Sequence, residues 1–191
     1  MALTFKPKSE EELNSYCQEG SKFIGLAEPI IPEIKIAGGS MGLGFPGAVG
    51  LALAKKLKGE DGMVYCLMSD GEMAIGTTWE SALVANHHNL DNLIVIIDNN
   101  GLQAMGKTED ILKVGGLPMR GFHIDGHNYK DLETYLFPHL FEGLDTRKGP
   151  WLITCNTIKG KGVSFMEDNN LWHYKSPNKE EYNLAKKELN V

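Results

Sequence analysis

The chain has 191 residues, of which 42% are hydrophobic and 23% charged, the composition of one ordinary globular domain, so we expect residues 1–191 to form a single unit. The formal net charge of −6 disfavours a nucleic-acid surface, which would carry a basic excess. No apolar run is long enough to span a membrane, the N-terminus has no apolar signal core, and three scattered cysteines favour a reducing compartment, so we expect a cytoplasmic protein.

The first third of the chain predicts two helices separated by irregular backbone. Ser9 can cap the first helix, because Glu12 follows three residues later, as in a capping box. Prolines break regular structure before a glycine-dense turn, GGSMGLGFPG, which leads into the second helix. The expected elements are a helix over residues 9–18, irregular chain over 20–37, the turn over 38–47 and a helix over 46–58.

Three continuous apolar runs in the rest of the chain are typical of strands buried on both faces: residues 63–68, 93–97 and 151–156. Patterns that favour helices separate and follow them. Strands that alternate with helices predict an α/β fold, with helices on both faces of a mostly parallel sheet, that is, three α/β/α layers. We expect helices over residues 76–88, 128–141 and 178–190, and a shorter strand near 122–125.

Ligands of such sheets bind at the carboxyl ends of the strands. Ser69-Asp70-Gly71-Glu72 follows the first predicted strand, and Asp98-Asn99-Asn100-Gly101-Leu102 follows the second. If these strands are neighbours, Asp70 and Asn100 converge and offer oxygen ligands, which suit magnesium that also binds phosphate. D-G and N-G are also common turn dipeptides, but two of them at two strand ends favour a binding site. Gly71 would let the backbone approach a phosphate closely.

The same residues carry a resemblance to the transketolase family of thiamine-diphosphate enzymes. The segment SDGEMAIGTTWESALVANHHNLDNLIVIIDNNGLQAMG resembles the family pattern G-D-G-E-x-x-E-G-x-x-W-E-A…L-D-N-L…D-x-N. GGSMGLGFPGAVGLALAKK resembles G-S-L-G-x-G-x-x-x-A-V-G-M-A, FHIDGHNYKDL resembles the G-H segment, and TIKGKGVSFMEDNNLWHY resembles T-x-K-G-x-G…W-H-G. The motifs occur in order over roughly residues 10–175.

The resemblance implies a thiamine-diphosphate-binding fold and a role for individual residues. Magnesium ligands are implied at Asp70, Asn100 and the carbonyl of Leu102. Cofactor contacts are implied at Gly39, Met41, Gly71, Glu72, Lys159 and His173. His173 is also implied as the catalytic proton shuttle, since a histidine titrates near neutrality; judged without the family, it would be a surface histidine beside Trp172.

The chain departs from the family pattern at several positions. Ser69 replaces the first glycine of G-D-G, Ile75 replaces an acid of the family's dimer interface, and Leu26 stands where a substrate-facing histidine is usual. The N-terminal helices with their sugar-binding histidines have no counterpart. The catalytic glutamate of the family lies on a pyrimidine-binding domain, which has no counterpart either. The resemblance therefore implies a split enzyme, in which a separate subunit supplies that glutamate in an α2β2 assembly that acts on small carbonyl substrates.

Three other functions remain open from the sequence. Gly42-Leu43-Gly44-Phe45-Pro46-Gly47 is a literal G-x-G-x-x-G with an acid, Asp70, at the next strand end, as in dinucleotide-binding modules. Only a short, poor strand over residues 34–37 precedes it, however, and the later motifs stay unexplained. A non-catalytic relative fits the departures, and a 2-oxo acid decarboxylase subunit fits the missing histidines.

Overall fold

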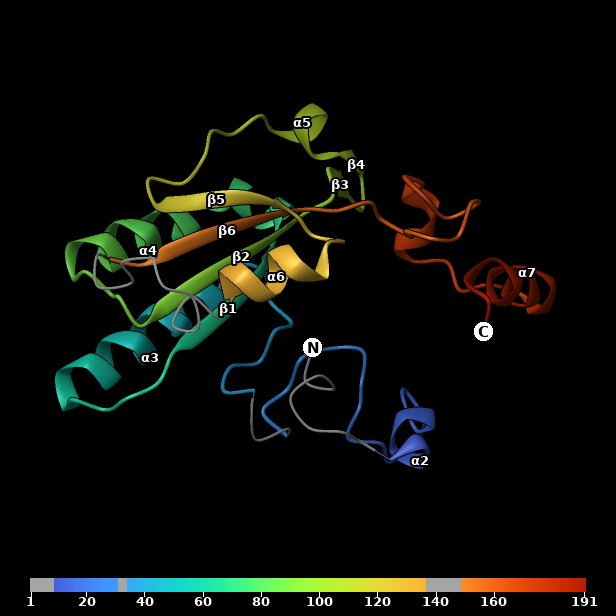
Figure 1. Cartoon of the computed structure of the whole chain (residues 1–191), viewed down its shortest axis with the longest axis horizontal. Coiled ribbons are helices and arrows are strands. Elements are labelled where there is room, and N and C mark those ends of the chain that lie inside the picture. Colours follow the sequence, from blue (N-terminus) through green and yellow to red (C-terminus); the bar gives the residue numbers. More distant parts are fainter. Residues whose placement is uncertain (1–8, 31–33, 137–148) are drawn as a thin grey trace.

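The computed structural model describes residues 9–30, 34–136 and 149–191. Four strands form one sheet in the order β1-β2-β6-β5, and every neighbouring pair is parallel (Figure 1). The predicted parallel sheet is therefore confirmed. The strands are β1 (Val64–Ser69), β2 (Leu93–Asn99), β5 (Arg120–Asp125) and β6 (Trp151–Asn156).

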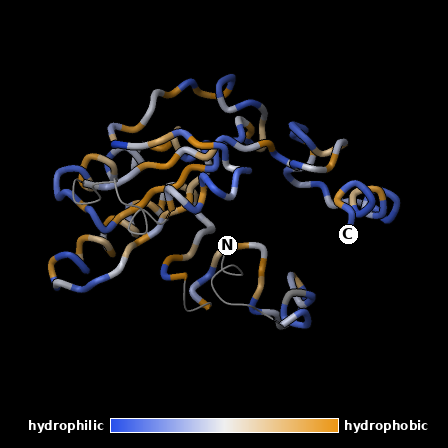
Figure 2. The backbone as a smooth tube through the Cα atoms, viewed as in Figure 1, coloured by the Kyte–Doolittle hydropathy of each residue, from blue (hydrophilic) through white to orange (hydrophobic). Residues whose placement is uncertain are grey.

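Helices cover both faces of the sheet, which confirms the three-layer α/β/α prediction. On one face, α3 (Gly44–Lys58) and α4 (Gly76–His87) pack against alternate residues of β2, such as Val95. On the other face, α6 (Tyr129–Leu136) packs against the intervening residues, such as Ile94. Hydrophobic residues are concentrated in the strands, whereas the residues of the C-terminal helix are largely hydrophilic (Figure 2).

The ends of the helices follow from local chemistry. Glu12 N–H donates to Ser9 Oγ at 3.1 Å and Ser9 N–H donates to Glu12 Oε2 at 3.2 Å, so the predicted capping box precedes α2 (Glu10–Asn14). α3 ends where Gly59 adopts φ 67° and its N–H bonds back to the carbonyls of the last turn. Asn178 and Glu181 form a second capping box at the start of α7 (Lys179–Leu189).

Several short elements were absent from the sequence prediction: η1 (Asp70–Ala74), β3 (Leu102–Gln103), β4 (Gly106–Lys107), α5 (Thr108–Ile111) and η3 (Asn170–His173). The helix expected over residues 128–141 is described to Leu136, and the rest lies outside the described residues. Residues 34–37, considered as a short strand before the glycines, form no strand. None of the described helices combines the length and apolar composition needed to cross a bilayer.

Candidate functional site

The loops that follow β1 and β2 meet at the carboxyl edge of the sheet. Ser69 at the end of β1 pairs with Asp98 of β2. The next residue, Asp70, accepts a hydrogen bond from Gly101 N–H at 2.8 Å and one from the Thr108 hydroxyl at 3.1 Å, both on Oδ2. The structure therefore brings the Asp70 carboxylate to the Asn100–Leu102 loop, at the sheet edge where the sequence predicted a site.

Asp70 is a buried carboxylate, only 4% exposed. Burial raises its pKa, hydrogen bonds from Gly101, Thr108 and the backbone of Gly71 oppose that rise, and the charge of Asp98 adds to it. No lysine, arginine or histidine pairs with Asp70 within residues 9–30, 34–136 and 149–191. A mostly apolar cavity of about 360 Å³ also borders Asp70. Asp70 therefore forms no ion pair in the described part of the chain, although Lys113 and His123 line the same cavity.

The Asn100–Leu102 loop is held in one conformation. Asn100 Oδ1 accepts the Leu102 N–H at 2.9 Å, and Gly101 takes φ 73°, which a glycine adopts without strain. Gly101 carbonyl accepts the Thr108 N–H at 2.9 Å, so the β3-β4 hairpin folds back beside Asp70. Among the described residues, no group of three or more His, Cys, Asp or Glu could hold a metal. The loop instead offers one carboxylate, from Asp70, together with amide and carbonyl oxygens, and such oxygen ligands suit a hard cation such as magnesium.

Gly71 and the glycine loop of residues 38–43 lie side by side. A Cβ atom on Gly71 would lie 3.2 Å from Gln103 Cδ and 3.4 Å from Met41 Cε, so a larger residue would require these two side chains to shift by a few tenths of an ångström. Met41, a predicted cofactor contact, is thus adjacent to Gly71. Gly39, predicted for the same role, lies against Leu26 instead: its Cβ would be 3.5 Å from Leu26 Cδ1.

Glu72 has a role that the sequence did not reveal. Its Oε1 accepts the Gly42 N–H at 2.9 Å, and its Oε2 accepts the Ser69 N–H at 3.0 Å. The carboxylate therefore ties the glycine loop to the end of β1. Since both oxygens bind backbone amides, Glu72 can shape the cofactor site without touching the cofactor, and the direct contact stays a prediction.

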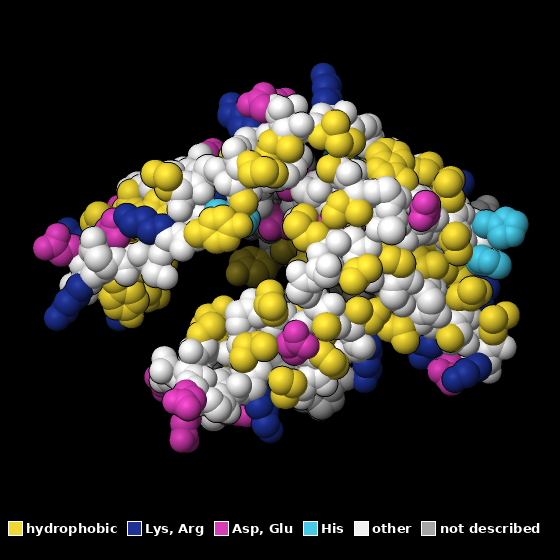
Figure 3. Space-filling view, turned by 180° about the vertical axis from the view of Figure 1, so that it is seen from behind, with side chains coloured by type: hydrophobic (Ala, Val, Ile, Leu, Met, Phe, Trp, Pro, Cys, Tyr) yellow, Lys and Arg dark blue, Asp and Glu magenta, His cyan; other side chains and the backbone are white. Residues whose placement is uncertain are grey.

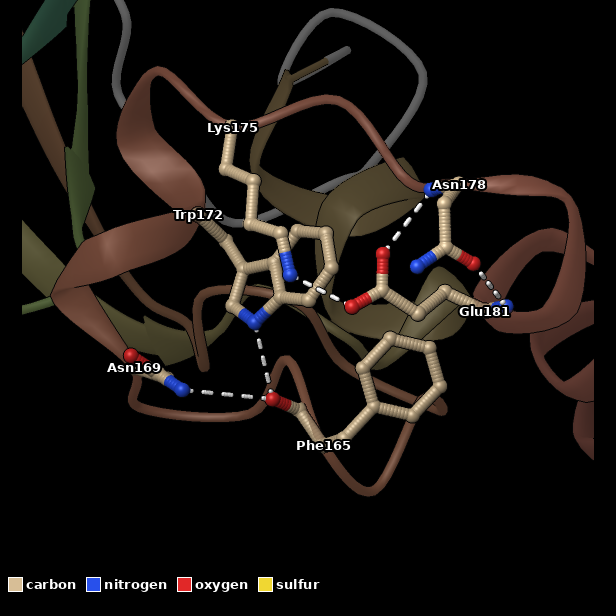
Figure 4. A network of polar contacts seen from close by, with 6 residues as sticks. All are labelled: Phe165, Asn169, Trp172, Lys175, Asn178 and Glu181. Carbon is tan, nitrogen blue, oxygen red and sulfur yellow. Dashed lines mark hydrogen bonds and ion pairs between the residues drawn. The ribbon is translucent and has the colours of Figure 1, made fainter.

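The segment that carries His173 is anchored from two sides. Asn170 Nδ2 donates to the carbonyl of Ala104 at 2.9 Å, which joins η3 to the β3-β4 hairpin. On the other side, Trp172 Nε1 donates to the Phe165 carbonyl at 2.9 Å (Figure 4). Lys175 Nζ lies 4.3 Å from the centre of the Trp172 ring and also forms an ion pair with Glu181 of α7. His173 itself is exposed, so a fixed backbone presents its imidazole to solvent.

Lys159 lies in the loop after β6 and is partly buried. Its carbonyl accepts the Asp168 N–H at 3.0 Å, and its ammonium pairs with no acid in the described ranges. His127 Nε2 accepts the Ile158 N–H at 2.8 Å and so fixes this loop, a role that the sequence analysis missed. Asn156 was also missed, although its place at a strand end could have indicated it; its Oδ1 accepts Asn99 Nδ2 at 2.9 Å.

Comparisons with known proteins agree with this arrangement. Residues 5–191 match the family described as transketolase, thiamine diphosphate binding domain. The chain is 37% identical over 185 residues to one subunit of the apulose-4-phosphate transketolase of Actinobacillus succinogenes, covering 94% of this chain and 66% of that protein. It is 35% identical over 164 residues to the SqwG subunit of the 6-deoxy-6-sulfo-D-fructose transketolase of a Clostridium species, covering 82% of this chain and 58% of that protein.

A solved transketolase from Campylobacter jejuni superposes on the chain with a TM-score of 0.83 at 26% identity, covering 100% of this chain and 31% of that one. The chain thus spans less than two thirds of the curated relatives named above and a smaller part of the solved enzyme. The dinucleotide-binding alternative loses its support, because the strand it requires before the glycines is not formed. The fold, the positions of the motifs and the family match agree. The chain belongs to the transketolase family and corresponds to the thiamine diphosphate-binding domain of that family.

Proposed function

We propose that this chain is the thiamine-diphosphate-binding subunit of a split transketolase-like transferase, which moves a two-carbon unit between small carbonyl compounds. The observation that carries the proposal is the hydrogen bond from Gly101 N–H to Asp70 Oδ2, at 2.8 Å, which joins the two loops of the diphosphate motif. The two relatives that are named as single subunits of transketolases support the split architecture. Three free thiols, two of them buried, support work in a reducing, cytoplasmic setting.

The residues present fit a magnesium ion. Asp70 is buried and has no cationic partner in the described part of the chain, so a bound cation would neutralise it. The hydrogen bonds from Gly101 and Thr108 both use Oδ2, so Oδ1 would be the oxygen that binds a metal. Asn100 and the carbonyl of Leu102 would add neutral oxygens, and phosphate oxygens or water would complete the octahedron that magnesium prefers.

The diphosphate would lie beside the metal, against Gly71. Met41 lies next to Gly71, and Gly39 belongs to the same loop, so the glycine loop would cover the cofactor from one side. Lys159 would approach from the loop after β6 and offset phosphate charge. Glu72 would hold the glycine loop in register through Gly42.

When bound, thiamine diphosphate supplies the carbanion chemistry needed for attack on a carbonyl carbon. This chain's part is to bind and orient the cofactor and to move a proton. His173 would exchange that proton with a substrate oxygen, and the Asn170 and Trp172 contacts would hold the imidazole in place. A variant His173→Ala should therefore lose far more turnover than cofactor affinity, because other implied contacts still hold the cofactor.

A partner subunit with a pyrimidine-binding domain would supply the catalytic glutamate, in an α2β2 assembly. Large hydrophobic side chains are exposed on both sides of the site. A space-filling view shows a deep notch, with hydrophobic side chains along its rim, between two lobes of the molecule (Figure 3). The exposed hydrophobic side chains on the N-terminal segment, the glycine loop and the C-terminal segment include Tyr16, Leu26, Ile30, Met41, Leu43, Leu171 and Tyr174. Such a surface favours a protein interface.

The test is calorimetry on the complex of the chain with its partner. Thiamine diphosphate should bind with magnesium, and chelation of the metal should abolish binding. Asp70→Ala should remove binding, whereas Asp61→Ala, at an exposed loop position, should not. Unchanged affinity in Asp70→Ala would show that the site lies elsewhere. Turnover then separates the alternatives: ketol transfer supports the proposal, release of CO₂ from a 2-oxo acid indicates a decarboxylase, and binding without turnover indicates a non-catalytic relative.

A further inference from the structure

We propose that Gln103 determines affinity for the diphosphate, by donating a hydrogen bond from its side-chain amide to a phosphate oxygen. The proposal rests on the function proposed above and adds a residue to which the family resemblance gave no role. Gln103 belongs to β3, the first strand of the hairpin beside Asp70. The side-chain amide of Gln103 indicates a ligand, because its nitrogen lacks a hydrogen-bond acceptor.

Gln103 Nε2 is buried and has no hydrogen-bond partner in the described part of the chain. Buried amide donors are nearly always paired, because an unpaired one gives up its bonds to water and gains none in return. Trp151 Nε1 is a second such donor, but Trp151 begins β6, at the amino end of the sheet. Among the described residues, Gln103 is thus the unpaired buried donor that lies at the carboxyl edge of the sheet.

The side chain of Gln103 lies over Gly71. A Cβ built on Gly71 would meet Gln103 Cδ at 3.2 Å and Cγ at 3.3 Å. Gly71 directly follows Asp70, whose carboxylate is the proposed metal ligand. The amide is therefore adjacent to the space that a metal-bound phosphate would occupy, and a phosphate oxygen there would be the missing acceptor.

The hairpin positions the backbone of Gln103 in advance of binding. Leu102 and Gln103 pair with Lys107 and Gly106, and the carbonyl of the next residue, Ala104, accepts the Asn170 side-chain amide at 2.9 Å. A residue whose backbone is already positioned loses less conformational freedom when a ligand binds. An amide also carries no charge, so it favours a phosphate oxygen without competing with the magnesium ion for Asp70.

The experiment compares Gln103→Leu with the wild-type chain in the complex with its partner. Thiamine diphosphate and inorganic pyrophosphate, each with magnesium, should both bind about tenfold more weakly to the variant, because a hydrogen bond to a charged oxygen is lost. Gln103→Glu should bind more weakly still, since a carboxylate repels phosphate. The matched control is Gln18→Leu, at the chain's other glutamine, which is exposed and should change nothing.

Thermal unfolding without ligand separates this role from a structural one. Leucine removes an unpaired buried donor, so Gln103→Leu should melt at the same temperature as the wild type or higher. Equal affinity of Gln103→Leu and wild type for both ligands would overturn the inference, and so would normal binding by Gln103→Glu, which would mean that the amide accepts a bond. Failure of the wild-type complex to bind thiamine diphosphate would refute the proposed function itself.

Discussion

The Glu72 carboxylate accepts the backbone N–H of Gly42 at 2.9 Å, across 30 residues of sequence. Its other oxygen holds the Ser69 N–H, so one side chain joins the end of β1 to the glycine loop. Ser69 and Glu72 complete a capping box around η1. A single carboxylate therefore sets the position of two segments that the proposed cofactor would touch.

Replacing Glu72 with alanine should destabilise the fold, because it leaves two partly buried N–H groups without acceptors. The expected loss is about 2 kcal/mol in the free energy of unfolding, measured by urea denaturation. Glu72→Gln keeps one carbonyl oxygen and should lose less. Equal stability of Glu72→Ala and wild type would mean that water or another group replaces the carboxylate at both amides.

Two glycines with positive φ offer a test of backbone crowding. Gly160 has φ 75°, and a Cβ there would lie 2.6 Å from the Met166 carbonyl oxygen, whereas Gly59 has φ 67° and open space around it. Gly59→Ala should cost about 1 kcal/mol from left-handed strain alone. Gly160→Ala should cost clearly more, because backbone atoms must also move. Similar losses in the two variants, compared by chemical denaturation, would contradict the crowding argument.

The three cysteines should differ in reactivity. Cys17 is exposed, while burial raises the pKa of the Cys66 thiol to about 12 and that of Cys155 to about 11. Since the thiolate is the reactive form, a disulfide reagent at pH 8 should modify one thiol rapidly in the native chain and the other two only after denaturation. Cys17→Ser should remove the rapid phase. A rapid phase that survives this substitution would contradict the assignment.

The pair Lys175–Glu181 should make stability depend on pH in the acid range. The side-chain bond from Lys175, followed by the Asn178 N–H, lowers the pKa of Glu181 below its usual value. A carboxyl group with a lowered pKa in the folded state stabilises the fold above its unfolded pKa of about 4.3, and that contribution is lost as the pH falls through the folded value. Glu181→Gln should therefore be less stable than wild type at pH 7, with a gap that closes in acid.

Denaturation curves at several pH values between neutrality and strong acid would measure this gap. Glu180→Gln, one residue earlier in the same helix, provides the control, because Glu180 is exposed and forms no ion pair in the described part of the chain. A gap that stays constant down to the lowest pH would show that Glu181 acts through packing and not through its charge.

The sequence predicted the larger elements well, because their hydrophobic patterns are local and continuous. The runs VYCLM, LIVII and WLITCN lie in β1, β2 and β6. The residues of LIVII are buried, and so are the central residues of WLITCN, as predicted, whereas β1 is an edge strand and leaves Leu67 48% exposed, so the prediction of burial on both faces was wrong for β1. The weaker strand near residues 122–125 was confirmed as β5, two residues longer at its start. The meeting of Asp70 with the loop after β2 also followed from sequence, because parallel strands place their carboxyl ends at one edge.

The short elements and the supporting contacts could not be predicted in the same way. The hairpin of β3 and β4 has two residues in each strand, too few for any periodic pattern. It is fixed by bonds to distant partners, such as Asn170 to Ala104, which lie 66 residues apart. The roles of Glu72 and Gln103 likewise depend on which backbone groups come near them, and that is known only once the sheet order is known.

The strand order carries a consequence for how the chain folds. β5 has β6 as its one neighbour in the described sheet, yet β6 follows it in sequence. During synthesis from the N-terminus, β5 therefore leaves the ribosome before any strand exists with which it can pair. Until Trp151–Asn156 inserts between β2 and β5, only α6 among the described elements can cover Phe122 and Ile124, so we expect this insertion to be a late step of folding.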